Sequence, residues 1–179
     1  MGMKRGAKPA VHRAPSARPA RCVVITVSDT RGLASDRSGD AIARSLARAG
    51  HQVLSRHIVR DEVPAIRRAV RAAWKRPRVD AILLTGGTGM APRDRTPEAV
   101  APLLDLELPG FGEQFRALSA RQVGSAAWLS RAGAGVAKRR LVVWLPGSPR
   151  AAALGVSRLV APELSHVLGL LQRVSSRPS

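Results

Sequence analysis

Cysteine and aromatic residues are scarce in this 179-residue sequence, which has one Cys, no Tyr, two Phe and three Trp. A single cysteine, Cys22, excludes an internal disulfide framework and a multi-cysteine zinc site. Cys22 opens an apolar segment, so we expect a buried structural thiol rather than a nucleophile. The four histidines are dispersed, at His12, His51, His57 and His166, and indicate no zinc site.

Long hydrophobic runs are also missing. No apolar run approaches the roughly 18 residues that a transmembrane helix needs, and no apolar signal-peptide core follows the basic start. We therefore expect no membrane partner and a cytoplasmic location. The length suits one domain with a sizeable core.

Acidic residues are few, with 12 Asp and Glu against 30 Lys and Arg, for a formal net charge of +18. Residues 1–20 mix Pro, Ala, Arg and Lys without hydrophobic periodicity, which predicts a flexible basic tail before a single domain over residues 21–175. A strongly positive net charge suggests nucleic acid as a possible ligand. Arginine is nevertheless scattered through the later helices, and few aromatic side chains are present for base stacking. A polyanionic small substrate or a solvated basic surface explains the charge at least as well, and no nucleic-acid partner is expected.

Strand and helix patterns alternate along the chain. The predicted strands are Arg21–Val27, Gln52–Val59, Val79–Leu84 and Arg140–Leu145. Helical spacing follows each strand, and the last two helices are predicted to start at Pro149 and to cover about Pro162 to Arg173. This alternation predicts an α/β fold with a parallel sheet and right-handed crossovers.

A glycine-rich loop follows the third predicted strand. Gly86, Gly87 and Gly89 allow positive φ angles and close approach of a ligand, and successive N–H groups of such a loop can hold an anion. Arg93 supplies a counter-charge for a phosphate, and Asp94 a partner for a metal ion or a proton. Glycines alone fit an ordinary turn equally well.

Polar loops also follow the other predicted strands, at Ser28–Thr30, Asp61 and Pro146–Ser148. Parallel strands would bring all of these loops to one edge of the sheet, where ligands bind in open α/β folds. This convergence favours a phosphate site over a plain turn.

Several of the same positions suit structural roles. Helix N-caps prefer Ser, Thr, Asp and Asn, a role open to Asp36 or Ser38, Asp61, Thr96 and Ser148. Contact with a ligand is an equal alternative for Thr96. For Asp94 the structural alternatives are an ion pair with Arg93 or a helix cap.

Five motifs carry a family resemblance: V-S-D-T at 27–30, D-R-S-G at 36–39, T-G-G-T-G-M-A-P-R-D-R-T-P-E-A at 85–99, S-R-A-G-A-G at 130–135 and L-P-G-S-P at 145–149. With them the chain resembles the MoaB/MogA family of molybdenum-cofactor biosynthesis proteins over roughly residues 21–173. The segment L-P-G-F-G-E-Q-F-R-A-L-S at 108–119 is closer to the MoaB branch.

The resemblance implies a three-layer α/β/α, molybdopterin-binding fold with a mostly parallel central sheet, assembled as a homo-oligomer, trimer or hexamer. The activity it implies is adenylyl transfer from Mg-ATP to molybdopterin. Other cofactor-biosynthesis proteins are candidate partners.

The resemblance also assigns candidate residues. Asp61 and Asp94 match two essential aspartates and are the candidate catalytic groups and Mg²⁺ ligands, although family members often have proline where this chain has Arg60. Nucleotide phosphates are assigned to the glycine loop, at Gly86, Gly87, Thr88 and Gly89. Substrate contacts are assigned to Ser28, Asp29, Thr30, Ser130, Pro146, Gly147, Ser148 and Arg150.

Two alternatives remain. One is a non-catalytic, molybdopterin-binding or scaffolding oligomer of the MoaB type. The other is a CinA-like nucleotide pyrophosphatase, against which Arg93 argues, because acidic residues usually follow the glycines there. The sequence also leaves open ATP or another nucleotide, and a molybdenum or tungsten pathway.

Overall fold

The computed structural model describes residues 18–173 of the chain. Its strands are β1 (Arg21–Val27), β2 (Gln52–Val59), β3 (Ala81–Thr85), β4 (Leu106–Glu107), β5 (Gly133–Ala137) and β6 (Arg140–Leu145). Its α-helices are α1 (Arg37–Arg48), α2 (Val63–Lys75), α3 (Thr96–Val100), α4 (Pro109–Val123), α5 (Pro149–Gly155) and α6 (Ala161–Arg173). Shorter helical turns are η1 (Leu33–Ser35), η2 (Ala101–Leu103), η3 (Gly124–Leu129) and η4 (Val156–Val160).

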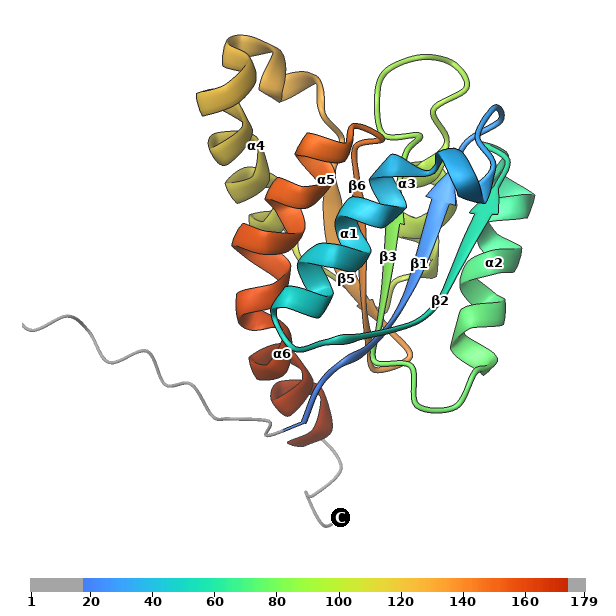
Figure 1. Ribbon diagram of the computed structural model, residues 1–179, viewed down its shortest axis with the longest axis vertical. Helices are drawn as coiled ribbons and strands as arrows, with labels where there is room; N and C mark the ends of the chain where they lie inside the picture. The colour runs from blue at the N-terminus through green and yellow to red at the C-terminus, as the bar shows by residue number, and fades with distance from the viewer. Residues whose placement is uncertain (1–17, 174–179) are drawn as a thin grey trace, which may run out of the picture.

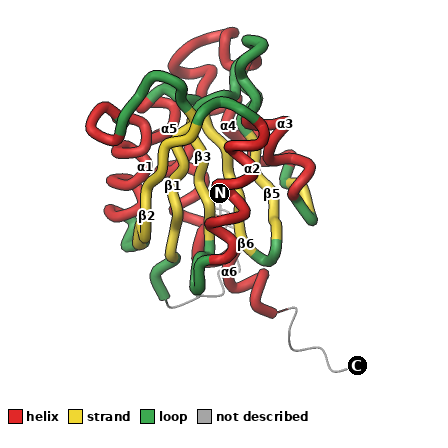
Figure 2. Tube along the Cα trace, turned by 90° about the vertical axis from the view of Figure 1, so that its right-hand side faces the viewer, coloured by secondary structure: helices red, strands yellow, loops and turns green. Residues whose placement is uncertain are grey.

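The strands form one six-stranded sheet in the order β2-β1-β3-β6-β5-β4. The pairs β1–β2, β1–β3 and β3–β6 are parallel, whereas β5 runs antiparallel to β6 and β4 antiparallel to β5. Helices α1, α4, α5 and α6 cover one face, and α2 and α3 cover the other (Figures 1 and 2). The predicted three-layer α/β/α fold with a mostly parallel sheet is therefore confirmed.

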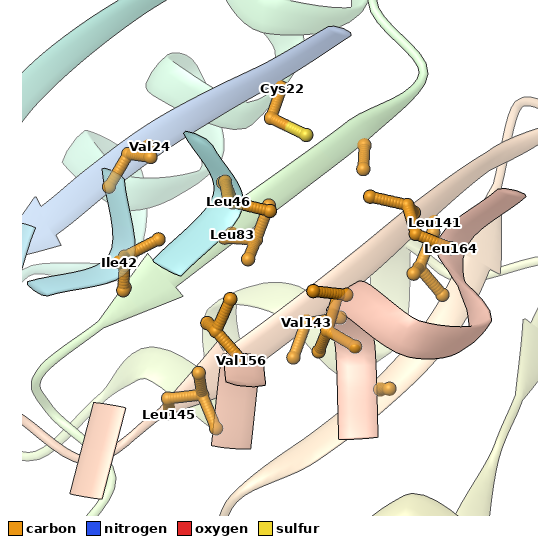
Figure 3. Packing of buried hydrophobic residues seen from close by; sticks show 14 of the residues in the cluster. Cys22, Val24, Ile42, Leu46, Leu83, Leu141, Val143, Leu145, Val156 and Leu164 are labelled. Atoms are coloured by element: carbon orange, nitrogen blue, oxygen red, sulfur yellow. The ribbon is translucent and has the colours of Figure 1, made fainter. Parts of the chain in front are cut away.

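Successive residues of the central strands enter the cores on opposite faces of the sheet, as the period of two requires. In β1, for example, Cys22 and Val24 face the α1/α5/α6 side, and Val23 and Ile25 face the α2/α3 side. Figure 3 shows the first core, where Ile42 and Leu46 of α1 pack against the strand side chains. Cys22 is fully buried, and burial, aided by the charge of Asp80, raises the pKa of its thiol to about 12. The expectation of a structural thiol is confirmed.

Two strands, β4 and β5, were not predicted from the sequence. Gly133 and Gly135 give β5 little intrinsic strand preference, and both lie where a larger residue would clash. A Cβ on Gly133 would approach the Trp144 ring to 2.3 Å, and one on Gly135 would approach Leu104 Cδ1 to 2.4 Å. The strand is therefore selected by packing against its neighbours rather than by local propensity.

The two C-terminal helices predicted separately form one continuous helix from Pro149 to Arg173, with a π-helical turn at Val156–Val160. This widened turn directly precedes Pro162, which has no N–H to donate within a helix. Contrary to expectation, this helix is long and apolar enough over Pro149–Leu171 to cross a membrane, by length and composition only. Its buried apolar side chains belong to the core against the sheet: Ala152, Val156, Val160, Ala161, Leu164 and Leu168. Figure 3 shows Val156 and Leu164 in this core.

The beginning of the described chain is attached to the sheet. Of the predicted tail, residues 1–17 lie outside the described part. Arg18 donates to both carboxylate oxygens of Asp80, at 2.8 and 2.7 Å, and Ala20 is fully buried. Asp80 also accepts from the backbone N–H of Arg21, and β3 begins after it, at Ala81 rather than at the predicted Val79.

Candidate active site

A cleft of about 480 Å³ lies at the carboxyl ends of the parallel strands, where the connecting loops gather (Figure 2). Its lining is Val27, Ser28, Asp29, Thr30, Arg31, Asp61, Gly86, Gly87, Thr88, Gly89, Asp94, Leu129, Ser130, Pro146 and Gly147. The structure thus brings the loops after β1, β2, β3 and β6 to one edge, as the parallel arrangement predicts.

The glycine loop, residues 85–95, arches over this edge between β3 and α3 (yellow-green at the top of Figure 1). Gly86 has φ +103° and Gly87 has φ +63°, both in the region that side chains disfavour. A Cβ on Gly86 would lie 2.2 Å from the Val27 carbonyl oxygen. A Cβ on Gly87 would lie 2.5 Å from Asp61 Oδ2 and from Thr96 Oγ1. Glycine is therefore required at both positions.

Asp61 lies against Gly87, and Asp94 lies against Gly89. Asp61 Oδ1 accepts from the Arg95 N–H at 2.9 Å, and Asp94 Oδ2 accepts from the Ala91 N–H at 2.8 Å. The predicted helix-cap alternative for Asp61 is wrong, because Glu62 precedes α2 without a side-chain cap. The predicted Asp94–Arg93 pair is also wrong: Arg93 Nη2 bonds to Asp29 Oδ2 at 2.6 Å.

The carboxylates repel one another. Burial raises the pKa of Asp61, and the nearby charges of Asp94 and Asp29 raise it further, against the opposing hydrogen bond from Arg95 N–H. Asp29 bridges the strand ends, because its Oδ1 accepts from the Asp61 N–H at 3.3 Å while Arg93 holds its Oδ2. A bound cation would relieve this repulsion.

The start of α1 is bonded to a loop that lines the cleft. Asp36 caps α1 through Gly39 N–H at 2.9 Å, which confirms one of the two predicted caps. Burial opposes ionisation of Asp36, but hydrogen bonds from Arg56, Gly39 and Thr26 outweigh burial and lower its pKa. Ser38 is not the cap: its Oγ donates to the Gly147 carbonyl at 2.6 Å and so joins α1 to the loop after β6.

The predicted cap role of Thr96 is wrong. Arg95 occupies the position before α3, and Thr96 is the first helical residue. Its fully buried hydroxyl donates to the Gly86 carbonyl at 2.7 Å and so fixes the glycine loop from below.

Two predicted substrate residues lie outside this cleft. Ser148 caps α5 through Ala151 N–H at 3.4 Å, which confirms its structural role. Ser148 and Arg150 line a smaller cavity of about 200 Å³ between α4, η3 and α5. Ser130 and Pro146 line both spaces, so the two are neighbours.

Sequence reasoning missed Arg31, Leu129 and Arg131. Arg31 lines the cleft and donates to Gly147 O at 3.2 Å and to Ser38 Oγ at 3.0 Å. Arg31 directly follows the polar loop Ser28–Thr30, so its position at a strand end could have identified it as a cation of the site. Leu129 lines the cleft and Arg131 bonds to the glycine loop. Neither has such a local signal, because both precede a strand that was not predicted.

The donor set suits a magnesium ion that also binds phosphate. Within residues 18–173 no three His, Cys, Asp or Glu side chains are arranged to hold a metal. Asp61 Oδ2 and Asp94 Oδ1 accept no hydrogen bond from this part of the chain, and hard carboxylate oxygens are suitable Mg²⁺ ligands. Mg²⁺ is commonly held by one or two carboxylates together with substrate phosphates, which fits these two residues.

The chain is similar to known proteins over most of its length. Residues 23–166 match the family model described as "Probable molybdopterin binding domain". "Molybdenum cofactor biosynthesis protein B" of Halalkalibacterium halodurans is 47% identical over 158 residues, 88% of this chain and 93% of that protein. The protein of the same name from Bacillus subtilis is 50% identical over 149 residues, 83% of this chain and 88% of that protein.

A solved structure extends the likeness to three dimensions. The crystal structure of a molybdenum cofactor biosynthesis protein B superposes with a TM-score of 0.84 at 44% identity, covering 87% of this chain and 98% of that one. The fold and cleft define a protein of the molybdopterin-binding domain class. Within that class the chain belongs to the MoaB/MogA family, on its MoaB side.

Proposed function

We propose that this protein acts in molybdenum cofactor biosynthesis by binding molybdopterin and adenylylating it with Mg-ATP. The observation that carries the proposal is the arrangement of Asp61 and Asp94 beside Gly87 and Gly89, in a cleft lined by the loops at the strand ends. The names of the relatives and of the family model support the pathway and the pterin ligand.

In this reaction a phosphate oxygen of molybdopterin attacks the α-phosphorus of ATP. The new P–O bond forms as the bond from the α-phosphorus to the bridging oxygen breaks, and pyrophosphate leaves with the electron pair. Gly87, Thr88 and Gly89 present backbone N–H groups to the triphosphate, whereas the Gly86 N–H donates to the Leu145 carbonyl at 3.0 Å. The negative charge on the phosphate oxygens is the main barrier that these groups lower. Asp61 and Asp94 would hold Mg²⁺, which supplies charge neutralisation when bound.

The remaining lining residues orient the second substrate. Ser28, Thr30 and Ser130 offer hydroxyl groups, and Arg31 offers a cation beside Gly147. The cavity that contains Ser148 and Arg150 adjoins the cleft through Ser130 and Pro146, and it gives molybdopterin room to extend. We also propose a homo-oligomer, and other proteins of the pathway as partners.

The test is pyrophosphate release from Mg-ATP with and without molybdopterin. We expect release that depends on molybdopterin and falls by about 100-fold or more in Asp61→Asn and in Asp94→Asn. Glu107→Gln, an exposed acid on β4, is the matched control and should release pyrophosphate at the wild-type rate. Molybdopterin binding without turnover would instead identify a non-catalytic binding protein.

A further inference from the structure

Arg131 connects the glycine loop to the rest of the molecule. Its Nε donates to the Gly89 carbonyl at 2.8 Å, and its Nη2 donates to the Asp94 carbonyl at 2.8 Å. Nη1 pairs with the carboxylate of Glu98 in α3. The backbone N–H of Arg131 donates to the Thr88 carbonyl at 3.0 Å. One residue therefore holds the carbonyls on both sides of segment 90–93.

Two features fix Arg131 in this place. Strand β5 is antiparallel to β6, with Gly133 opposite Trp144, so residues that precede β5 arrive at the ligand edge of the sheet. The Trp144 indole N–H then donates to the Arg131 carbonyl at 2.8 Å. Gly133 is required beneath it, because a Cβ there would overlap the Trp144 ring.

The segment that Arg131 holds has little other support. Met90, Ala91, Pro92, Arg93 and Arg95 are all exposed. Its remaining bonds are the pair between Arg93 Nη2 and Asp29 Oδ2 at 2.6 Å, a local turn between Ala91 and Asp94, and contacts at its ends. Within residues 18–173, the Gly89 and Asp94 carbonyls accept their tertiary hydrogen bonds from the Arg131 guanidinium.

We propose that Arg131 is a positioning residue for the adenylyl-transfer site: it fixes the glycine loop so that Asp94 and the loop N–H groups face the cleft. Arginine suits this role because its planar group presents several donors in a fixed fork, whereas lysine is a single point charge. The expected effect of Arg131 on turnover rests on the proposed function, whereas its expected effect on the order of the glycine loop does not.

The experiment compares Arg131→Lys and Arg131→Met with Arg140→Lys in the full-length chain. Arg140 is the matched control because it also donates to two backbone carbonyls, of Val79 at 3.0 Å and Lys138 at 2.9 Å, near the start of β6 and away from the cleft. The first measurement is amide hydrogen exchange by NMR at Ala91, Asp94, Arg95 and Thr96, whose N–H groups are bonded within or beneath the loop.

We expect exchange at these four amides to accelerate about tenfold or more in both Arg131 variants, with β1 and β3 amides unchanged. In steady-state pyrophosphate release, kcat should fall roughly 10- to 100-fold, with a smaller change in the KM for molybdopterin. Arg140→Lys should leave loop exchange and kcat at wild-type values, even where it lowers Tm.

Unchanged loop exchange in Arg131→Lys, or wild-type kcat in that variant, would overturn the positioning role. So would acceleration spread equally over the whole sheet, which is the result expected of a general loss of stability. A wild-type protein without turnover refutes the proposed function alone. In that case the exchange measurement still decides whether Arg131 holds the loop.

Discussion

At the scale of single residues, the partly or fully buried carboxylates of this chain lie in different environments. Asp36 and Asp80 are nearly inaccessible to solvent but have lowered pKa values, because hydrogen bonds from arginines and backbone N–H groups outweigh burial. Asp61 has a raised pKa, because burial and two neighbouring acids outweigh its one backbone bond. The fold therefore leaves the charge of Asp61 in the cleft uncompensated, whereas hydrogen bonds compensate the charges of Asp36 and Asp80.

This difference predicts that Asp61→Asn stabilises the ligand-free protein while it abolishes turnover. Since folding raises the pKa of Asp61, the ionised group weakens the folded state above that pKa, and the penalty disappears as the pH falls below the unfolded value of about 3.9. We expect Tm to rise by roughly 2 °C at pH 7 and not at pH 3, measured by calorimetry. Mg²⁺ should raise the Tm of the wild type more than that of the variant. A lower Tm for the variant at pH 7 would contradict this account.

Arg18→Met tests the opposite case. Burial opposes ionisation of Asp80, but the hydrogen bonds from Arg18 and from Arg21 N–H lower its pKa, so this pairing stabilises the fold above the unfolded value of about 3.9. The stabilisation is lost as the pH falls through the folded pKa. We expect a loss of about 1–2 kcal/mol at pH 7, moderated because the Arg18 side chain is 41% exposed.

Urea denaturation at pH 7 and at pH 3 measures that loss, which should shrink at the lower pH. Arg68→Met, an exposed arginine in the middle of α2, is the control and should change the free energy of unfolding little at either pH. Equal losses at pH 7 and pH 3 would show that Arg18 acts through packing rather than through charge.

At the scale of elements, the conformation of the glycine loop is fixed by the residues packed against it. Val27, Asp61 and Thr96, from three other segments, occupy the space where side chains of Gly86 and Gly87 would project. Gly147 also lies against the loop, although less tightly, since a Cβ there would be 3.3 Å from Gly86 Cα. The loop is thus packed backbone, and this packing presents its N–H groups in a fixed arrangement.

Gly87→Ala is therefore expected to cost about 1–3 kcal/mol in the free energy of unfolding, from the positive φ and from contact with the Asp61 carboxylate. It should also lower molybdopterin-dependent pyrophosphate release, because Asp61 must move. Gly110→Ala is the matched control: its Cβ meets nothing within 4 Å, and it lies in the first turn of α4. Urea denaturation should show the control unchanged or slightly more stable. A neutral Gly87→Ala would contradict the packed-loop description.

At the scale of the whole molecule, charge opposes association. The chain has a formal net charge of +18, while several large apolar side chains are exposed, among them Leu33, Met90 and Trp128. A homo-oligomer would cover part of such apolar surface against the repulsion between like-charged copies.

We accordingly predict that a trimer or hexamer of the 19.0 kDa chain is favoured by salt. Between about 0.01 M and about 1 M ionic strength the Debye length falls from about 30 Å to about 3 Å, which screens the repulsion. Analytical ultracentrifugation across this range should show the assembled fraction rising. A variant without residues 1–17, which contain four of the cations, should assemble with a weaker salt dependence. A monomer at every ionic strength would refute the prediction.

The elements that could be predicted are those with a local signal. The continuous apolar runs of β1, β3 and β6 and the helical spacing of Ile66, Val70 and Ala73 require no knowledge of neighbours. Parallel order then places the strand-end loops together, so most of the cleft lining follows from the chain alone. Strands of a parallel sheet that are buried on both faces are apolar along their whole length, so they can be predicted from the sequence.

Contacts between distant segments lack such a signal. The antiparallel course of β5, the Asp29–Arg93 pair and the bonds from Arg131 to the glycine loop join residues that lie far apart in sequence. Their geometry depends on which strand edge is left to pair and on the space that Gly133 leaves beside Trp144. Local sequence patterns therefore determine which strands and loops contribute to this site. Long-range packing determines which side chains and backbone groups face each other across it.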